Sequence, residues 1–102
     1  MNITVRGTAE TLYIYLSGEL DEYSARAARE RADREIDEHA GVSRVVIDLA
    51  EVCFMDSAAI GFLIGRYKKL KRYQTPLFVR GASAAADKVL SVSGIYTLIP
   101  KI

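Results

Sequence analysis

Apolar residues recur along the chain with two different periods. Ile3 and Val5 alternate with polar neighbours, and the same period of two returns over Leu12–Leu16. This alternation is typical of β-strands, whose successive side chains point to opposite faces. Only the short segment Gly7–Glu10 separates the two runs, so they are predicted to form an antiparallel hairpin.

The stretch Arg44–Tyr73 combines both periods. The β-branched run Val45–Leu49 predicts a buried strand, and after Asp56 and Ser57 the apolar spacing predicts an α-helix. The helical apolar positions are Ile60, Leu63, Ile64, Tyr67 and Leu70. Asp and Ser are typical of helix N-termini, because their side-chain oxygens accept a free backbone N–H. We therefore expect a strand-to-helix junction at Asp56-Ser57.

The rest of the chain continues to alternate helix and strand. The segment Tyr23–His39 predicts a helix with Ser24 as its cap, an alanine-rich inner stripe, and a left-handed glycine, Gly41, after its end. The other predicted elements are a strand at Leu77–Val79, a helix at Ser83–Ser91 and a strand at Ile95–Ile99. The order β-β-α-β-α-β-α-β predicts a single α/β domain over residues 1–102. Its sheet is mixed and mostly parallel, with an N-terminal hairpin and helices packed on it.

Composition and charge exclude several classes of function. The chain has 14 basic and 13 acidic residues, so we expect no general attraction to nucleic acid or to an anionic membrane. The apolar runs are too short to span a bilayer and no charged-then-apolar leader precedes the first strand, so we expect a cytoplasmic protein. Cys53 is the single cysteine and cannot form an internal disulfide; we expect it to be a small buried apolar residue.

Titratable residues form no catalytic pattern in the sequence. The one histidine, His39, is remote from Ser57 in sequence, so nothing indicates a catalytic triad. Gly61 and Gly65 lie inside a predicted helix rather than before it, which favours close-packing positions over a phosphate-binding loop. We therefore predict a protein that is not an enzyme and has no cofactor.

The Asp56-Ser57 pair allows two interpretations on these grounds. Either both residues only cap the helix, or Ser57 is a phosphoacceptor at a helix N-terminus, where the dipole tolerates added negative charge. Asp21 could meet Asp56 at one end of the sheet, but two carboxylates are too few to indicate a metal site.

Four segments, in this order, resemble one protein family. They are Leu16–Asp21, Phe54–Gly61, Gly65–Lys68 and Val92–Ile95. Together they are similar to the STAS-domain anti-sigma factor antagonists, and most of all to the anti-sigma-F factor antagonists of spore-forming bacteria. The block Phe54-Met55-Asp56-Ser57 is the most specific of these matches.

This resemblance implies a phosphorylation-controlled binding protein that regulates transcription in sporulation. In the family, the serine after the aspartate is phosphorylated by an anti-sigma factor that is also an ATP-dependent serine kinase. The unphosphorylated antagonist binds this kinase and makes it release its sigma factor, and a phosphatase resets the switch.

Carried over to this chain, the resemblance makes Ser57 the phosphoacceptor. The residues it implies for partner binding are Asp21, Asp56, Ala58, Ala59 and Gly61. Two alternatives remain. One is a scaffold subunit of a stress-signalling or lipid-transport complex, and the other is a small phosphotransfer or nucleotide-hydrolysing enzyme.

Two features depart from the family pattern. Ala59 stands where the family has a glycine, close to Ser57. Family members also continue into a C-terminal helix where this sequence stops at Ile102, so a missing C-terminal helix is expected to leave part of one sheet face uncovered.

The uncovered sheet face predicts a weak homodimer, because exposed apolar patches favour self-association. Sedimentation velocity over a concentration series should show a sedimentation coefficient that rises with concentration. A monomer that persists at high micromolar concentration would contradict this prediction.

Overall fold

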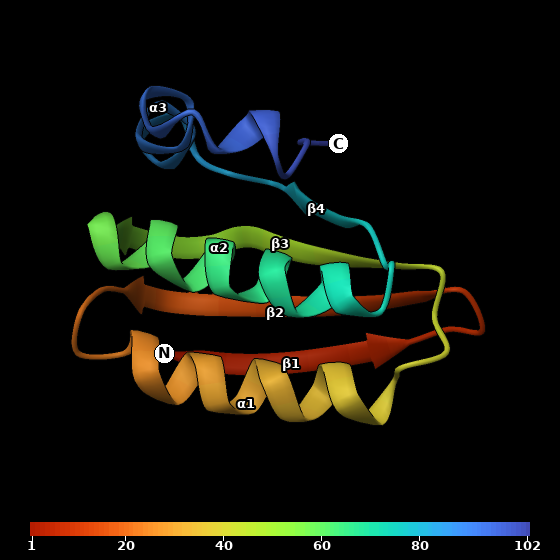
Figure 1. Cartoon of the computed structure of the whole chain (residues 1–102). Helices are drawn as coiled ribbons and strands as arrows, with labels where there is room; N and C mark the ends of the chain where they lie inside the picture. Colours follow the sequence, from red (N-terminus) through yellow and green to blue (C-terminus); the bar gives the residue numbers. More distant parts are fainter.

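Four strands form one mixed sheet in the order β1-β2-β3-β4 (Figure 1). The computed structural model describes residues 1–102. β1 (Asn2–Gly7) pairs antiparallel with β2 (Thr11–Leu20), and β3 (Arg44–Met55) runs parallel both to β2 and to β4 (Leu77–Arg80). The predicted hairpin and the mostly parallel sheet are therefore confirmed.

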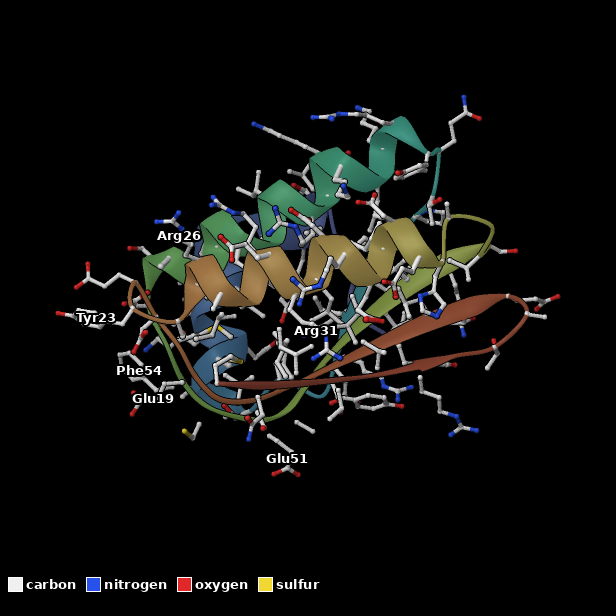
Figure 2. All side chains as sticks on the ribbon, turned by 90° about the horizontal axis from the view of Figure 1, so that it is seen from below. Glu19, Tyr23, Arg26, Arg31, Glu51 and Phe54 are labelled. Atoms are coloured by element: carbon white, nitrogen blue, oxygen red, sulfur yellow. The ribbon has the colours of Figure 1, made fainter.

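Three helices pack on a single face of this sheet: α1 (Ala25–Glu38), α2 (Ser57–Arg72) and α3 (Ala84–Ser93). Figure 2 shows α1 and α2 together on one side of the strands. Alternate strand residues face the helices and are buried, including Leu12, Ile14, Val45, Ile47 and Val79. Small side chains on α1, such as Ala28 and Ala32, are also buried and allow the helix to approach the sheet closely.

The opposite face of the sheet carries aromatic and charged side chains. Arg80 Nε lies 2.8 Å from Asp48 Oδ2, and the Arg80 guanidinium lies 4.8 Å from the centroid of the Tyr13 ring. The hydrogen bond to Asp48 raises the pKa of Arg80. Val46 is fully buried on this face, between its sheet neighbours Tyr13 and Phe78. Large half-buried side chains thus shield the middle of this face.

The predicted strand at Ile95–Ile99 is wrong. Ile95–Thr97 forms a 3₁₀-helix, η1, and Gly94 before it ends α3 in the left-handed conformation with φ +78°. Ile95 and Ile99 are both buried, so their spacing of four places them on one side of a helical turn. The chain meets the sheet only afterwards, where Lys101 forms a bridge with Val79 at the edge of β4.

A polar network holds this C-terminal segment against α3. The Tyr96 hydroxyl donates to Asp87 Oδ1 at 2.6 Å, and Lys101 Nζ lies 3.1 Å from the same oxygen. Burial and the bond to Asp87 raise the pKa of Tyr96 to about 12. Asp87 is therefore shared between two partners and is not free to pair with other cations.

Glycine positions differ from the sequence prediction. Gly41 does not adopt the left-handed conformation. α1 ends at Glu38 with His39 as its C-cap, and the chain turns through a bond from the Val42 N–H to the His39 carbonyl. Gly61 and Gly65 are not close-packing positions, because a methyl group at either would meet no atom within 4 Å. Both lie on the outer side of α2.

The buried face of α2 also includes a charged residue. Arg66 is only 5% exposed and its Nε lies 2.7 Å from Asp33 Oδ1 of α1, while its guanidinium lies 5.3 Å from the Phe62 ring centroid. Burial lowers the pKa of Arg66, and the charge of Asp33 opposes this shift. α2 packs against α1 as well as against the sheet. Its buried stripe is therefore turned toward α1, and the predicted inward residues Ile60 and Ile64 are only half-buried.

We predict that Asp33→Ala lowers the free energy of unfolding by about 3 kcal/mol, because it leaves a buried guanidinium without its counter-charge. Urea unfolding followed by circular dichroism measures the change. Asp37→Ala is the matched control, since it removes a more exposed ion pair with Lys69 on the same two helices and should have a smaller effect. Equal losses of stability in both variants would contradict the prediction.

Candidate functional site

The carboxyl ends of β2 and β3 bring two acidic residues to the same edge of the sheet. Leu20 and Met55 are paired across these strands and both are buried. The next residues, Asp21 and Asp56, therefore leave the core side by side, and the Asp56 N–H donates to the Leu20 carbonyl at 3.4 Å. Pairing between distant strands thus joins two of the positions that the family resemblance singled out.

Asp56 and Ser57 have different roles in the local structure. Asp56 is the N-cap of α2: its backbone is extended and its Oδ1 accepts the Ala58 N–H at 2.8 Å. Ser57 is the first residue of the helix, is exposed, and its hydroxyl bonds to no other protein group. Asp56 alone therefore provides the cap, and the Ser57 hydroxyl oxygen is accessible and without a hydrogen-bond partner in the chain.

Hydrogen bonds fix the Asp21 carboxylate. Its Oδ1 accepts the backbone N–H groups of Tyr23 and Ser24, each at 3.0 Å. These bonds, above all the one from the Ser24 N–H, lower the pKa of Asp21, so this half-buried group is an anion at neutral pH. Ser24 occupies the N-cap position of α1, as predicted, but its hydroxyl donates to the Glu19 carbonyl at 2.7 Å and makes no cap bond to the helix.

The remaining predicted partner-binding residues are exposed to different extents. Gly61 is exposed and Ala58 is half-buried, so both are accessible at the start of α2. Ala59 is fully buried, and its methyl group belongs to the hydrophobic core. A partner can therefore contact the backbone near Ala59 but not its side chain.

A groove lies between the start of α2 and α3, and Ser57 is part of its wall. Its volume is about 480 Å³. Its apolar lining consists of Met55, Ile60, Val89 and Val92, and its polar lining includes Asp56, Ser57 and Lys88. We refer to this feature as the Ser57 groove. The sequence predicted α3 but gave no indication that it stands opposite Ser57.

Two large aromatic side chains are exposed near the same end of the molecule. Tyr23 is 87% exposed and Phe54 is 52% exposed. Figure 2 shows them beside Glu19, which pairs with Phe54 across β2 and β3. Exposed aromatic residues are typical of protein-binding surfaces, where they act as anchors.

An irregularity in the sheet explains the exposure of Phe54 and of its neighbour Cys53. The register between β2 and β3 shifts, so that Gly18 pairs with Val52 but the next residue, Glu19, pairs with Phe54. Buried residues in β3 are therefore three apart here, at Val52 and Met55, rather than two. Cys53 is exposed, and the prediction that it is buried is wrong.

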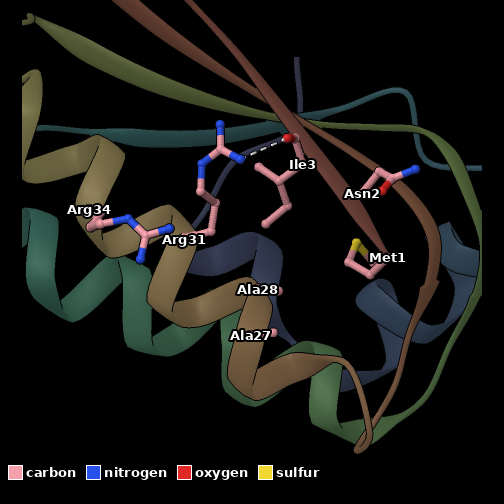
Figure 3. Close-up of a pocket in the computed structure, with 7 residues that line it drawn as sticks. All are labelled: Met1, Asn2, Ile3, Ala27, Ala28, Arg31 and Arg34. Atoms are coloured by element: carbon pink, nitrogen blue, oxygen red, sulfur yellow. Dashed lines mark hydrogen bonds between the residues drawn. The ribbon is translucent and has the colours of Figure 1, made fainter.

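Other clusters and cavities offer less chemistry. A pocket of about 310 Å³ lies between β1 and α1, where Arg31 Nη1 donates to the Ile3 carbonyl at 3.3 Å (Figure 3). Arg31 also pairs with Glu35, which offsets its charge. His39 stands at the end of α1, with its Nδ1 2.7 Å from the Glu35 carbonyl, so it is not a base for Ser57.

No three His, Cys, Asp or Glu side chains come together in an arrangement that could hold a metal ion. The helices are also too short or too polar for any of them to traverse a lipid bilayer.

Known proteins similar to this chain share one family. Residues 2–102 match the STAS domain. An anti-sigma F factor antagonist from Lysinibacillus sphaericus is 30% identical over 86% of this chain and 74% of its own length. An anti-sigma-B factor antagonist from Listeria monocytogenes is 29% identical over 97% of this chain and 88% of its own length.

Solved structures show the same fold. The unphosphorylated anti-sigma factor antagonist SpoIIAA superposes with a TM-score of 0.81 at 24% identity, over 99% of this chain and 88% of that one. An anti-sigma factor antagonist from Mycobacterium paratuberculosis gives a TM-score of 0.86 at 22% identity, over 98% of this chain and 83% of that one. The sequence matches show that the chain belongs to the STAS domain family and, within it, to the anti-sigma factor antagonists.

Proposed function

We propose that this chain is a phosphorylation-controlled anti-sigma factor antagonist of the cytoplasm. In its unphosphorylated form it binds an anti-sigma factor that is an ATP-dependent serine kinase, and this binding frees the sigma factor. Phosphorylation of Ser57 blocks the binding, and a phosphatase restores it. The observation that carries the proposal is the geometry of the α2 N-terminus, where Asp56 provides the cap and Ser57 presents an exposed hydroxyl.

The phosphoryl transfer requires a kinase with its own base and nucleotide. The Ser57 oxygen attacks the γ-phosphorus of ATP, a new O–P bond forms, the bond to the β-phosphate bridging oxygen breaks, and ADP leaves. The hydroxyl proton passes to a base on the kinase, because His39 is held at the end of α1. This chain therefore acts as the substrate and contributes an accessible oxygen.

The docking surface that we propose surrounds Ser57. It contains the anionic groups of Asp21 and Asp56, the Ser57 groove, the start of α2 at Ala58 and Gly61, and the aromatic anchors Tyr23 and Phe54. A partner that fits it carries hydrogen-bond donors for the two carboxylates and an apolar recess for the aromatic side chains. A phosphate adds about −1.5 to −2 charges, which the partner must desolvate when it binds, so phosphorylation opposes docking.

The fold should tolerate the phosphate. Negative charge is favourable at a helix N-terminus, and the Ser57 hydroxyl makes no hydrogen bond within the native structure. The proposed switch therefore acts through surface charge and requires no change of fold.

Substitution of Ser57 tests the proposal. Ser57→Ala should fold, bind the kinase and resist phosphorylation, because it removes only the acceptor oxygen. Ser57→Asp should also fold but bind more weakly, by about tenfold, since aspartate carries part of the charge of a phosphate. Mass spectrometry after incubation with the kinase and ATP locates the phosphate, and calorimetry measures binding.

Ser91→Ala is the matched control, because Ser91 is an exposed serine outside the Ser57 groove and should not affect phosphorylation. Phosphate on a residue other than Ser57, or normal phosphorylation of Ser57→Ala, would refute the assignment. If this chain captures a scaffold or transport subunit and not a kinase, the result favours the scaffold alternative.

Ala59→Gly tests the departure from the family pattern. Loss of helix propensity and of one buried methyl group should together lower the free energy of unfolding by about 1–2 kcal/mol. Phosphorylation should be equally fast or faster, because the Ala59 methyl faces the core and not the kinase. Urea unfolding and the initial rate of phosphate incorporation measure both effects. A clear fall in that rate, under conditions where the variant is folded, would contradict the expectation.

A further inference from the structure

The Ser57 groove has a cation on the wall opposite Ser57. Lys88 of α3 lines the groove, is exposed and forms no ion pair with this chain. The adjacent carboxylate, Asp87, is already shared by Tyr96 and Lys101. Lys88 is therefore a charged group without a partner, in the same cavity as the exposed Ser57 hydroxyl.

The carboxylate in the groove does not neutralise Lys88. Asp56 Oδ1 accepts the Ala58 N–H, and no salt bridge joins Asp56 to Lys88. The rest of the lining is largely apolar, and an ion pair beside apolar walls is screened less than one in open water. The groove thus favours a second anion at its Ser57 side.

We propose that Lys88 binds the phosphate of phosphorylated Ser57 across the groove and thereby closes the groove to the kinase. This proposal rests on the phosphorylation of Ser57 proposed above. The long alkyl stem of Lys88 packs along the apolar wall, and its ammonium group pairs with the phosphate oxygens. The backbone N–H groups at the start of α2 face the phosphate from the other side.

The closed groove gives phosphorylation a second effect besides added charge. An ion pair between α2 and α3 covers Ile60, Val89 and Val92, so a partner loses an apolar recess. Aspartate at position 57 is shorter than phosphoserine and carries less charge, so it closes the groove less well.

Titration of the phosphate tests the contact directly. Phosphoserine is incorporated at position 57 during translation, so no kinase is needed, and its second pKa is followed by ³¹P NMR. Of the charged side chains that line the groove, Asp56 raises this pKa and Lys88 lowers it. Lys88→Met keeps the alkyl stem but removes the charge, and should raise the titration midpoint by about half a pH unit.

Two further variants complete the comparison. Lys88→Arg keeps the cation and should titrate like the parent protein. Lys68→Met removes an exposed lysine of α2 that does not line the groove, and should leave the midpoint unchanged. If the phosphate titrates with the same midpoint in Lys88→Met and in Lys68→Met, the proposed contact is overturned.

Kinase binding tests whether the groove closes. Phosphorylation should weaken kinase binding in both proteins. The loss of affinity should be about threefold smaller in Lys88→Met than in the parent protein, because the apolar recess stays open in the variant. An unchanged factor would overturn the closure. The titration does not depend on the kinase, so failure of Ser57 phosphorylation by the kinase and failure of the Lys88 contact are distinguishable.

Discussion

Parallel pairing of β2 with β3 is the constraint on which the rest of the structure depends. The two strands are distant in sequence, and their shared end is sealed by the buried pair Leu20 and Met55. Because both strands stop at this point, Asp21 and Asp56 emerge together, and α2 must start beside them. The site is therefore positioned by the hydrophobic core and not by a mobile loop, which suits a surface that a partner must recognise in one geometry.

At the start of α2, neighbouring residues divide structural and chemical roles. Asp56 satisfies a helix N–H, so the cap does not need the Ser57 hydroxyl, which is exposed. The placement of all helices on one sheet face adds the second half of the site, because α3 then stands next to α2 and supplies Val89, Val92 and Lys88. In the proposed switch, phosphate acts on charge and on access to this groove, while the core stays as it is.

Local sequence was enough to predict most elements. Alternation around Ile14 predicted the hairpin, and the run at Val45–Leu49 predicted the central strand. The polar pair Asp56-Ser57 predicted the start of the helix. Each of these signals depends only on neighbours within a few residues. Resemblance to family motifs, rather than periodicity, selected Ser57 and Asp21. The residues alone leave open whether Ser57 is a cap or a phosphoacceptor.

Tertiary structure decided what depends on distant partners. The register shift in the β2–β3 pair turns Cys53 and Phe54 outward, although local alternation gives no sign of it. Arg66 is buried only because Asp33 of another helix balances its charge. Segment Ile95–Ile99 has the composition of a strand, yet the left-handed Gly94 and the core under α3 coil it into a helical turn. The sequence by itself thus determined the first seven elements and their order, from β1 to α3. Packing between elements determined which side chains lie beside Ser57, because burial and charge balance are properties of the assembled core.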